Sequence, residues 1–242
     1  MHTPVDAAIR GRRTSKVTSA DPLPPSGTSR EDLEALFETA GWAPFHRPAA
    51  EAHRGASPGA LPGAVPWRFH ALDAAGCRAL REALAGASGP VPGLLAAADA
   101  LVQVTWLPDP RVGAPRVGAP HVGDPREGDP PADSRTAPAS AGLFEPTLAN
   151  MEHIAAAAAA VQNLLVAATA RGLRTFWSSG GGVLRQPETL ARLGVGPAEV
   201  LLGSVFLFPA EAAGTAESGT GLREQRGALG DWMRWADPPP RP

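Results

Sequence analysis

The chain has 242 residues, of which 43% are hydrophobic, and its formal net charge is −2. This composition allows a sizeable core and argues against a general nucleic-acid or anionic-membrane binder. The single cysteine, Cys77, excludes an intrachain disulfide and a thiolate metal cluster and favours a reducing, cytoplasmic compartment. The N-terminus has no apolar signal core, so we expect no export.

The first predicted element is a short helix over residues 5–11, with Pro4 at its start, a position that suits proline. It leads into a basic cluster, residues 10–16, where four cations and two hydroxyls fall within seven residues. Arginine presents a planar fork of donors that fits phosphate oxygens, and lysine presents a point charge. The cluster is therefore either a phosphate site or a solvated basic terminus, and composition alone favours the solvated terminus.

A second helix is predicted to begin near Thr28 and Glu31, which have the spacing of a capping box, and to end near Trp42. His46 falls in the loop that follows, where a lone histidine is usually only a surface residue. Residues 47–65 are rich in Ala, Gly and Pro, with little to bury, and predict a mobile insert.

Two strands follow the insert. Residues 66–72 alternate in hydrophobicity and predict the first strand. Asp73 suits the N-cap of a helix that runs to about Ala85. Residues 99–107 contain Leu, Val and Trp side chains and predict the second strand.

A five-residue unit, Arg-Val-Gly-Ala-Pro and variants of it, occurs four times from residue 111 to residue 130. This period is far too short for a helical or propeller repeat, and each unit carries a Gly and a Pro. We expect a low-complexity insert at 108–147 within one domain that covers residues 1–242, followed by a tail at 209–242.

The Ala-rich stretch from Met151 to Arg171 has no internal Pro or Gly and predicts a long helix. Its larger apolar side chains recur at helical spacing and its opposite side is mostly alanine, so we expect it to be covered on nearly all faces. It is not expected to span a membrane, because Gln162 and Asn163 interrupt an apolar run shorter than the roughly 20 residues that a bilayer needs.

Gly172 ends this helix, and residues 173–177 predict a strand that leads into the glycine loop, residues 178–182. Small residues in such a loop let backbone N–H groups approach a planar ligand closely, although ordinary strand-to-helix loops also contain three glycines. Further on, a short helix is predicted at 187–193 and a buried strand at 199–208. In the tail, Trp232 and Trp235 are candidates to dock on the core or on a partner chain.

No metal set, Gly-x-Ser-x-Gly elbow or P-loop is present, and none of the six scattered histidines has paired-ligand spacing. Four stretches in order nevertheless resemble the FMN-dependent nitroreductase family, in particular its short, minimal members. They are Arg12-Arg-Thr-Ser-Lys16, Trp42-Ala-Pro-Phe-His46, Pro66-Trp-Arg-Phe69 and residues 159–180. The resemblance covers most of residues 5–107 and 148–208.

The resemblance implies an α+β sandwich, with a central, mainly antiparallel sheet flanked by helices. It also implies a homodimer formed through long central helices, with one FMN at each end of the interface. The basic cluster and the glycine loop would then meet, across two subunits, around one flavin. An all-round apolar central helix suits such a dimer core.

The positions that match the family's flavin-binding motifs are Arg12, Arg13, Thr14, Lys16, His46, Trp177, Ser178, Ser179 and Gly180. By the family pattern, Arg12 and Thr14 would contact the phosphate, and Arg13 or Lys16 the phosphate, the ribityl oxygens and the polar edge of the flavin. The strand end and loop from Trp177 would lie along the isoalloxazine ring, where a backbone N–H would bond N5 and tune its hydride acceptance. One departure is Val65, which stands where relatives usually carry an amide.

The implied activity is ping-pong oxidoreduction. NADH or NADPH would pass a hydride to the flavin, and a nitroaromatic, a quinone or a similar flat acceptor would take its place. No side chain need act as a dedicated acid or base, because the cofactor carries the chemistry. The alternatives are a flavin-binding sensor, carrier or partner-binding module on the same fold, and a helical dimerisation domain without a cofactor. Neither nucleic acid nor membrane is an expected partner.

Overall fold

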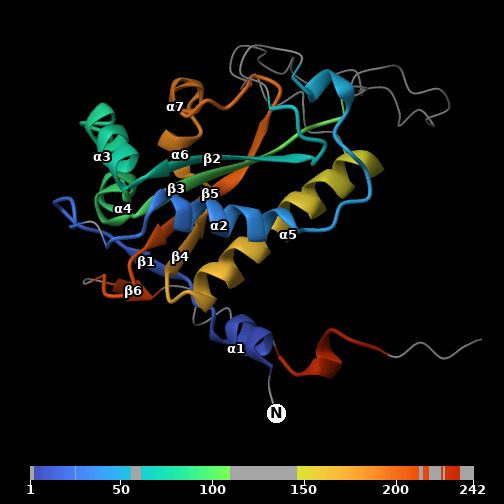
Figure 1. The fold of residues 1–242 in the computed structure, drawn as a ribbon, viewed down its shortest axis with the longest axis horizontal. Coiled ribbons are helices and arrows are strands. Elements are labelled where there is room, and N and C mark those ends of the chain that lie inside the picture. The colour runs from blue at the N-terminus through green and yellow to red at the C-terminus, as the bar shows by residue number, and fades with distance from the viewer. Residues whose placement is uncertain are drawn as a thin grey trace, which may run out of the picture.

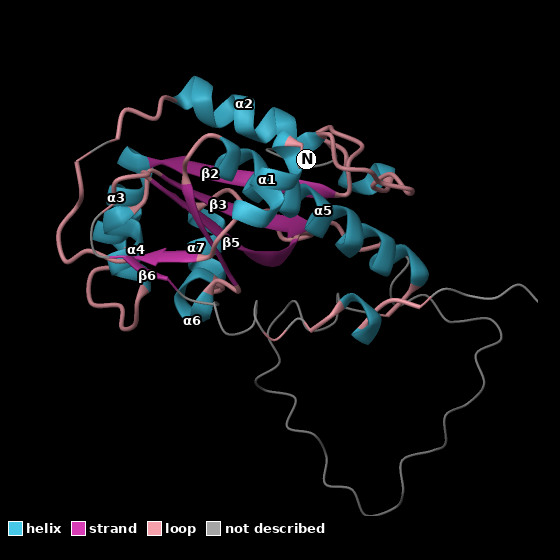
Figure 2. Ribbon diagram, turned by 90° about the horizontal axis from the view of Figure 1, so that it is seen from below, coloured by secondary structure: helices cyan, strands magenta, loops and turns pink. Residues whose placement is uncertain are grey.

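The computed structural model describes residues 3–24, 26–55, 61–109, 146–212, 215–217, 225 and 227–234. The pentapeptide repeats and Trp235 lie outside these residues. The described residues form a central sheet with helices on both faces (Figures 1 and 2), which is the expected α+β sandwich.

The central sheet has four antiparallel strands in the order β2-β3-β5-β4. The strands are β2 (Trp67–Asp73), β3 (Ala100–Trp106), β4 (Arg174–Ser178) and β5 (Val200–Phe208). Each lies within one or two residues of a predicted strand, so all four predictions are confirmed. The inner strands β3 and β5 are mostly apolar on both sides because helices cover both faces of the sheet.

One face of the sheet is covered by α2 (Arg30–Gly41) and α5 (Leu148–Ala170). In Figure 2 both helices lie on the same side of the strands. Leu36 of α2 and Leu164 of α5 are fully buried there, against Val205 of β5 and its neighbours. This layer confirms the second predicted helix and the long Ala-rich helix.

The opposite face carries four shorter helices, which Figure 2 shows on the far side of the strands from α2. They are α3 (Ala74–Ala83), α4 (Val91–Ala97), α6 (Gly181–Leu184) and α7 (Pro187–Arg192). Leu95 and Leu184 pack here against Phe206 and Phe208. Helices α3 and α7 were predicted, but α4 was not, because its seven residues fall inside a stretch rich in Gly, Pro and Ala.

The remaining elements lie at the edges of the molecule. The predicted N-terminal helix is α1 (Pro4–Gly11), and two 3-10 turns are η1 (Glu51–His53) and η2 (Leu229–Asp231). A second, two-stranded sheet pairs β1 (Ser15–Val17) with β6 (Thr215–Glu217). These strands of three residues were not predicted, because their pairing depends on partners about 200 residues apart rather than on a local pattern.

The capping box of α2 was predicted one residue too early. Ser29 is the N-cap, and its side chain and that of Asp32 bond each other's backbone N–H groups. Thr28 is engaged elsewhere, because its hydroxyl donates to the buried carboxylate of Asp99 at 3.2 Å. The predicted N-cap of α3 is confirmed, since the side chain of Asp73 accepts from the N–H of Gly76 at 2.8 Å.

Helix α5 begins three residues before its predicted start, because the hydroxyl of Thr147 caps it at the N–H of Asn150. With 23 residues it is long and apolar enough to cross a membrane by length and composition alone, a test that a buried core helix also passes. One side of α5 nevertheless forms the core against the sheet. The prediction that nearly all faces are covered does not hold within one chain, because Leu148 and Met151 remain 63% and 60% exposed.

The predicted insert at 47–65 is partly tied down, contrary to the expectation that it has little to bury. Ala49 is fully buried and donates its N–H to the carbonyl of Ala64 at 2.8 Å. The guanidinium of Arg54 donates to the carbonyl of Ala49 at 2.6 Å. Its closing segment is held by Arg68, which is only 4% exposed. The Arg68 guanidinium donates at 2.7–3.1 Å to four carbonyls, those of Leu61, Gly63, Val65 and Trp67.

Replacing Arg68 by methionine is expected to lower the free energy of unfolding by about 2 kcal/mol, because buried carbonyls lose charge-assisted donors. Urea denaturation of the purified protein measures this loss. The matched control is Arg30→Met on α2, whose exposed pair with Glu34 at 3.8 Å should contribute less than about 0.5 kcal/mol. Equal losses in the two variants would contradict a structural role for Arg68.

Candidate functional site

The basic cluster lies beside the strand that leads into the glycine loop. Thr14 forms a parallel bridge with Thr175 of β4, so β1 continues along the free edge of the central sheet in the same direction as β4. Two stretches about 160 residues apart in sequence are therefore neighbours within a single chain. The resemblance implied that the basic cluster and the glycine loop meet across two subunits. Within one chain the bridge joins Thr14 to the first part of β4, and the glycine loop follows at the other end of this strand.

The cations of the cluster are held in different ways. Arg12 is the C-cap residue of α1. One guanidinium nitrogen of Arg13 donates to the carbonyls of Arg10, Gly11 and Arg12 at 2.8–3.2 Å, so Arg13 satisfies the end of α1. This leaves fewer of its donors for a phosphate than the resemblance implied.

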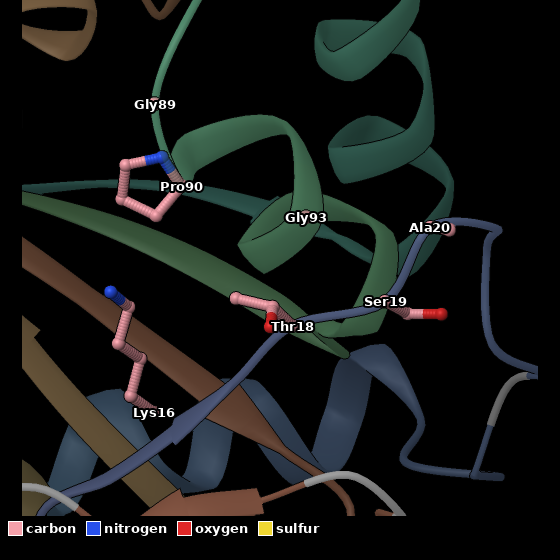
Figure 3. A pocket seen from close by; sticks show the side chains of 7 residues that line it. All are labelled: Lys16, Thr18, Ser19, Ala20, Gly89, Pro90 and Gly93. Atoms are coloured by element: carbon pink, nitrogen blue, oxygen red, sulfur yellow. The ribbon is translucent and has the colours of Figure 1, made fainter.

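Lys16, in contrast, lies on the wall of a cavity of about 450 Å³. The cavity is formed where the chain leaves β1 and passes the start of α4 (Figure 3). Its lining residues are Lys16, Thr18, Ser19, Ala20, Gly89, Pro90 and Gly93. In Figure 3 the ammonium end of Lys16 reaches toward Pro90. Of the nine predicted site residues, Lys16 is the one that lines this cavity.

Sequence reasoning missed the wall of the cavity that α4 supplies. Gly93 allows α4 to approach the chain closely, because a Cβ there would stand 3.2 Å from the Cβ of Thr18 and 3.3 Å from the carbonyl oxygen of Ser19. The N–H of Ser19 donates to the carbonyl of Gly93 at 3.0 Å. A signal for α4 was present, since Pro92 in the first turn, followed by Leu94 and Leu95, marks a helix start.

The glycine loop makes a sharp turn at the end of β4. Gly180 has φ of +97°, a conformation that favours glycine. A Cβ there would also stand 3.2 Å from the hydroxyl of Ser204 and 3.3 Å from the side chain of Leu201. A Cβ added to Gly181 would stand 4.0 Å from a side-chain methyl group of Val91 in α4. The loop is therefore a neighbour of the helix that forms the cavity wall.

Ser178 and Trp177 point to opposite sides of β4, as neighbours on a strand must. The hydroxyl of Ser178 accepts from the N–H of Gly180 at 3.1 Å. The indole of Trp177 lies across Gly203 of β5 and is 40% exposed. The strand end thus offers a half-exposed aromatic surface beside the loop, while the Ser179 side of the loop is exposed.

His46 is not brought to this cavity within one chain. It is exposed in the loop after α2, and it is not among the residues that line the cavity.

A partly buried polar cluster on the sheet was not predicted. The His70 ring Nε2 lies 2.7 Å from a carboxylate oxygen of Glu199, which also accepts a short hydrogen bond from Thr105. Burial by itself raises the pKa of Glu199, but the hydrogen bonds from His70 and Thr105 outweigh it and hold this pKa below its ordinary value. His70 and Glu199 are 129 residues apart, so no local pattern could reveal the pair.

Because folding lowers the pKa of Glu199, the stabilisation it provides is present above its ordinary pKa of about 4.3 and is lost as the pH falls through the folded value. Glu199→Gln is expected to lower the free energy of unfolding by about 2 kcal/mol at neutral pH. The difference from the parent protein should shrink as the pH falls below about 4. Denaturation curves at several pH values measure it, with Glu38→Gln on the exposed side of α2 as control. A difference that is the same at neutral and acidic pH would contradict this account.

No protein-family model matches the chain, and no curated protein matches it. Many solved structures are similar to it. A nitroreductase-like family protein from Bacillus cereus is 18% identical, with a TM-score of 0.53, and the match covers 95% of this chain and 97% of that one. A nitroreductase with bound FMN from Desulfitobacterium hafniense is 16% identical, with a TM-score of 0.52, and the match covers 98% and 100% of the two chains. CLA-ER, an enone reductase of gut-bacterial fatty acid saturation metabolism, is 14% identical, with a TM-score of 0.53 and coverage of 94% and 99%.

Proposed function

We propose that this chain, which has the nitroreductase fold, is an FMN-dependent oxidoreductase. The observation that carries the proposal is the parallel bridge between Thr14 and Thr175. The bridge joins the basic cluster to β4, the strand that leads into the glycine loop. This arrangement supports the proposal because FMN needs cations for its phosphate at one end and a close, uncharged surface for its flat ring at the other. The similar structures support FMN as that molecule, because the Desulfitobacterium hafniense nitroreductase carries it bound.

The residues at this edge suit FMN in chemistry and in space. The cavity beside Lys16, at about 450 Å³, falls in the range of about 300–1,000 Å³ that is usual for ligand pockets. Arg12, Thr14 and Lys16 supply positive charge and a hydroxyl for phosphate and polar flavin oxygens. Gly180 presents bare backbone, and Trp177 an aromatic surface, for the ring.

Bound FMN would supply two-electron transfer between a nicotinamide donor and a flat, electron-poor acceptor such as a nitroaromatic or a quinone. The chain's own part is to hold the phosphate with cations, to fix the loop at the end of β4, and to leave one side of the ring open to NADH or NADPH and then to the acceptor. No side chain need exchange a proton with the reacting groups. Ping-pong kinetics with a nitro or quinone acceptor would agree with this division of roles.

The absorbance spectrum of the purified protein tests the proposal. We expect flavin bands in the visible region, and we expect NADPH or NADH to bleach them. A folded protein that is colourless and takes up no added FMN would overturn the proposal. A protein that binds FMN but does not oxidise NAD(P)H in the presence of an acceptor would instead favour a flavin sensor or carrier.

We also propose that the protein is a homodimer. The side of α5 that faces away from the sheet is mostly apolar and partly exposed, and a groove of about 460 Å³ runs between α1, α2 and α5. Trp232 is 61% exposed, so it does not dock on the core of its own chain. A second copy of α5 would cover this apolar surface.

Ala155→Arg, on the exposed side of α5, is expected to convert the dimer to a monomer, because a long charged side chain would prevent close approach of two α5 helices. Sedimentation velocity measures the change. Ala191→Arg on the exposed side of α7 is the matched control and should leave the dimer intact. A parent protein that sediments as a monomer would exclude the dimer.

A further inference from the structure

The peptide group between Ser179 and Gly180 is held at both of its polar ends. The carbonyl oxygen of Ser179 accepts from Nε of Arg185 at 2.6 Å. The N–H of Gly180 donates to the hydroxyl of Ser178 at 3.1 Å. Because the C=O and N–H of a trans peptide point in opposite directions, these two bonds together fix the orientation of the peptide plane.

Arg185 lies at the C-terminal end of α6 and connects the glycine loop to the sheet. Its other guanidinium nitrogens reach the carbonyl oxygens of Leu201 and Leu202 of β5 at 3.2 and 3.5 Å. One planar side chain thus bridges the loop and the start of β5. A lysine, with a single nitrogen, cannot make the same set of bonds.

The glycine loop also rests on buried side chains of the central sheet. Gly180 lies over Ser204, whose hydroxyl donates to the side-chain oxygen of Gln103 at 2.6 Å. Ser204 and Gln103 are both fully buried, so this support is part of the core. The loop conformation is therefore set by the chain itself, which is the arrangement that preorganised binding sites require.

The locked peptide determines which backbone donors remain for a ligand. The N–H of Gly180 is taken by Ser178. Those of Ser179 and Gly181, on either side, have no acceptor within the part of the chain that the structure describes. A ligand at this loop would therefore find the donors of Ser179 and Gly181, in directions that the fixed peptide plane sets.

We propose that Arg185 is a positioning residue of the flavin site, which acts by locking the Ser179–Gly180 peptide and thereby aiming the neighbouring N–H groups at the cofactor. This inference rests on the proposed function, because it takes FMN as the ligand of the loop. It assigns no contact between Arg185 and the cofactor. A purely structural role of Arg185 would affect only the stability of the fold. A positioning role predicts that loss of Arg185 changes both the FMN affinity and the redox potential of the bound flavin.

The test compares Arg185→Met, Arg185→Lys and the control Arg192→Met, an exposed arginine of the adjacent α7, in the full-length protein. We expect Arg185→Met to raise the FMN dissociation constant about tenfold, a factor that corresponds to about 1.4 kcal/mol. It should also shift the flavin midpoint potential, with partial recovery in Arg185→Lys. Arg192→Met should change neither. An Arg185→Met protein with the affinity and the potential of the control would overturn the inference.

Amide hydrogen exchange in the absence of FMN tests the lock separately. Gly180 should exchange faster in Arg185→Met than in the parent protein and in Arg192→Met, because its peptide plane is no longer held. Unchanged exchange at Gly180 would overturn the lock even if FMN binding were weakened. A parent protein that takes up no FMN would overturn the proposed function, and the flavin role of Arg185 with it, whatever the exchange result.

Discussion

Replacement of Gly203 by alanine is expected to lower the free energy of unfolding by about 3 kcal/mol and to weaken the candidate site at the same time. A Cβ on Gly203 would stand 2.5 Å from the indole Nε1 of Trp177 and 2.7 Å from the backbone carbonyl of Ser178. The first contact can be relieved by moving a side chain, but the second cannot. Relief therefore requires β4 to move away from β5.

The cost is large because the clash lies between two paired strands of the main sheet. On the side away from β4, Gly203 pairs with Val104 of β3, next to a bulge between Val104 and Thr105. Because β3 holds β5 there, β5 cannot move away from β4 to relieve the clash. Moving β4 would displace Trp177 and the loop that begins at Ser178. Thermal denaturation and FMN titration should thus report a joint loss.

Gly41→Ala provides the matched control, because Gly41 is the last residue of α2 and a Cβ there meets nothing within 4 Å. Its expected change is within about 0.5 kcal/mol. If Gly203→Ala had the stability of this control, the close packing of Trp177 across Gly203 would be wrong. If Gly203→Ala lost stability but kept its FMN affinity, Trp177 and the loop would not belong to the site.

The long and strongly patterned elements could be predicted from the sequence. β5 was recognisable from a nearly continuous run of Val, Leu and Phe, and α5 from an Ala-rich stretch without Gly or Pro. In each element the local sequence and the tertiary environment favour the same secondary structure. The apolar residues of β5 suit a strand that is buried on both faces, and the high helix propensity of α5 suits a long helix. The ends were less certain, as the capping of α5 at Thr147 rather than near Met151 shows.

The short elements could not be predicted, because long-range contacts create them. β1 exists through its pairing with β6 and its bridge from Thr14 to Thr175. For the same reason the pair of His70 with Glu199 had no signal in the local sequence. The helix α4 did carry a signal, Pro92 in its first turn, which was missed. The two halves of the candidate site were recognised as motifs, but Arg185 was not, since its role depends on carbonyl groups that any residue would carry.

Replacement of Lys16 by methionine is expected to raise the FMN dissociation constant by about tenfold to a hundredfold, the range that corresponds to a lost hydrogen bond to a charged group. Lys16 is the only lysine in a chain whose other cationic side chains are arginines, and it lines the cavity beside α4. Stability should change little, because Lys16 is only half-buried. Fluorescence titration of FMN measures the loss of affinity. Added salt should weaken FMN binding more in the parent protein than in the variant, because the variant has one cation fewer to be screened.

The rarity of lysine makes a second, chemical form of this experiment selective. An amine-reactive reagent can modify only Lys16 and the N-terminal amine, and mass spectrometry of peptides separates the two. Bound FMN should protect Lys16 and leave the N-terminal amine reactive, since only a cofactor in this cavity shields the ammonium group. Lys16→Arg distinguishes charge from shape, because arginine keeps the positive charge but presents a larger planar head. If Lys16 were modified equally with and without saturating FMN, the cofactor would lie elsewhere, and the cavity at the start of α4 would have to serve another ligand.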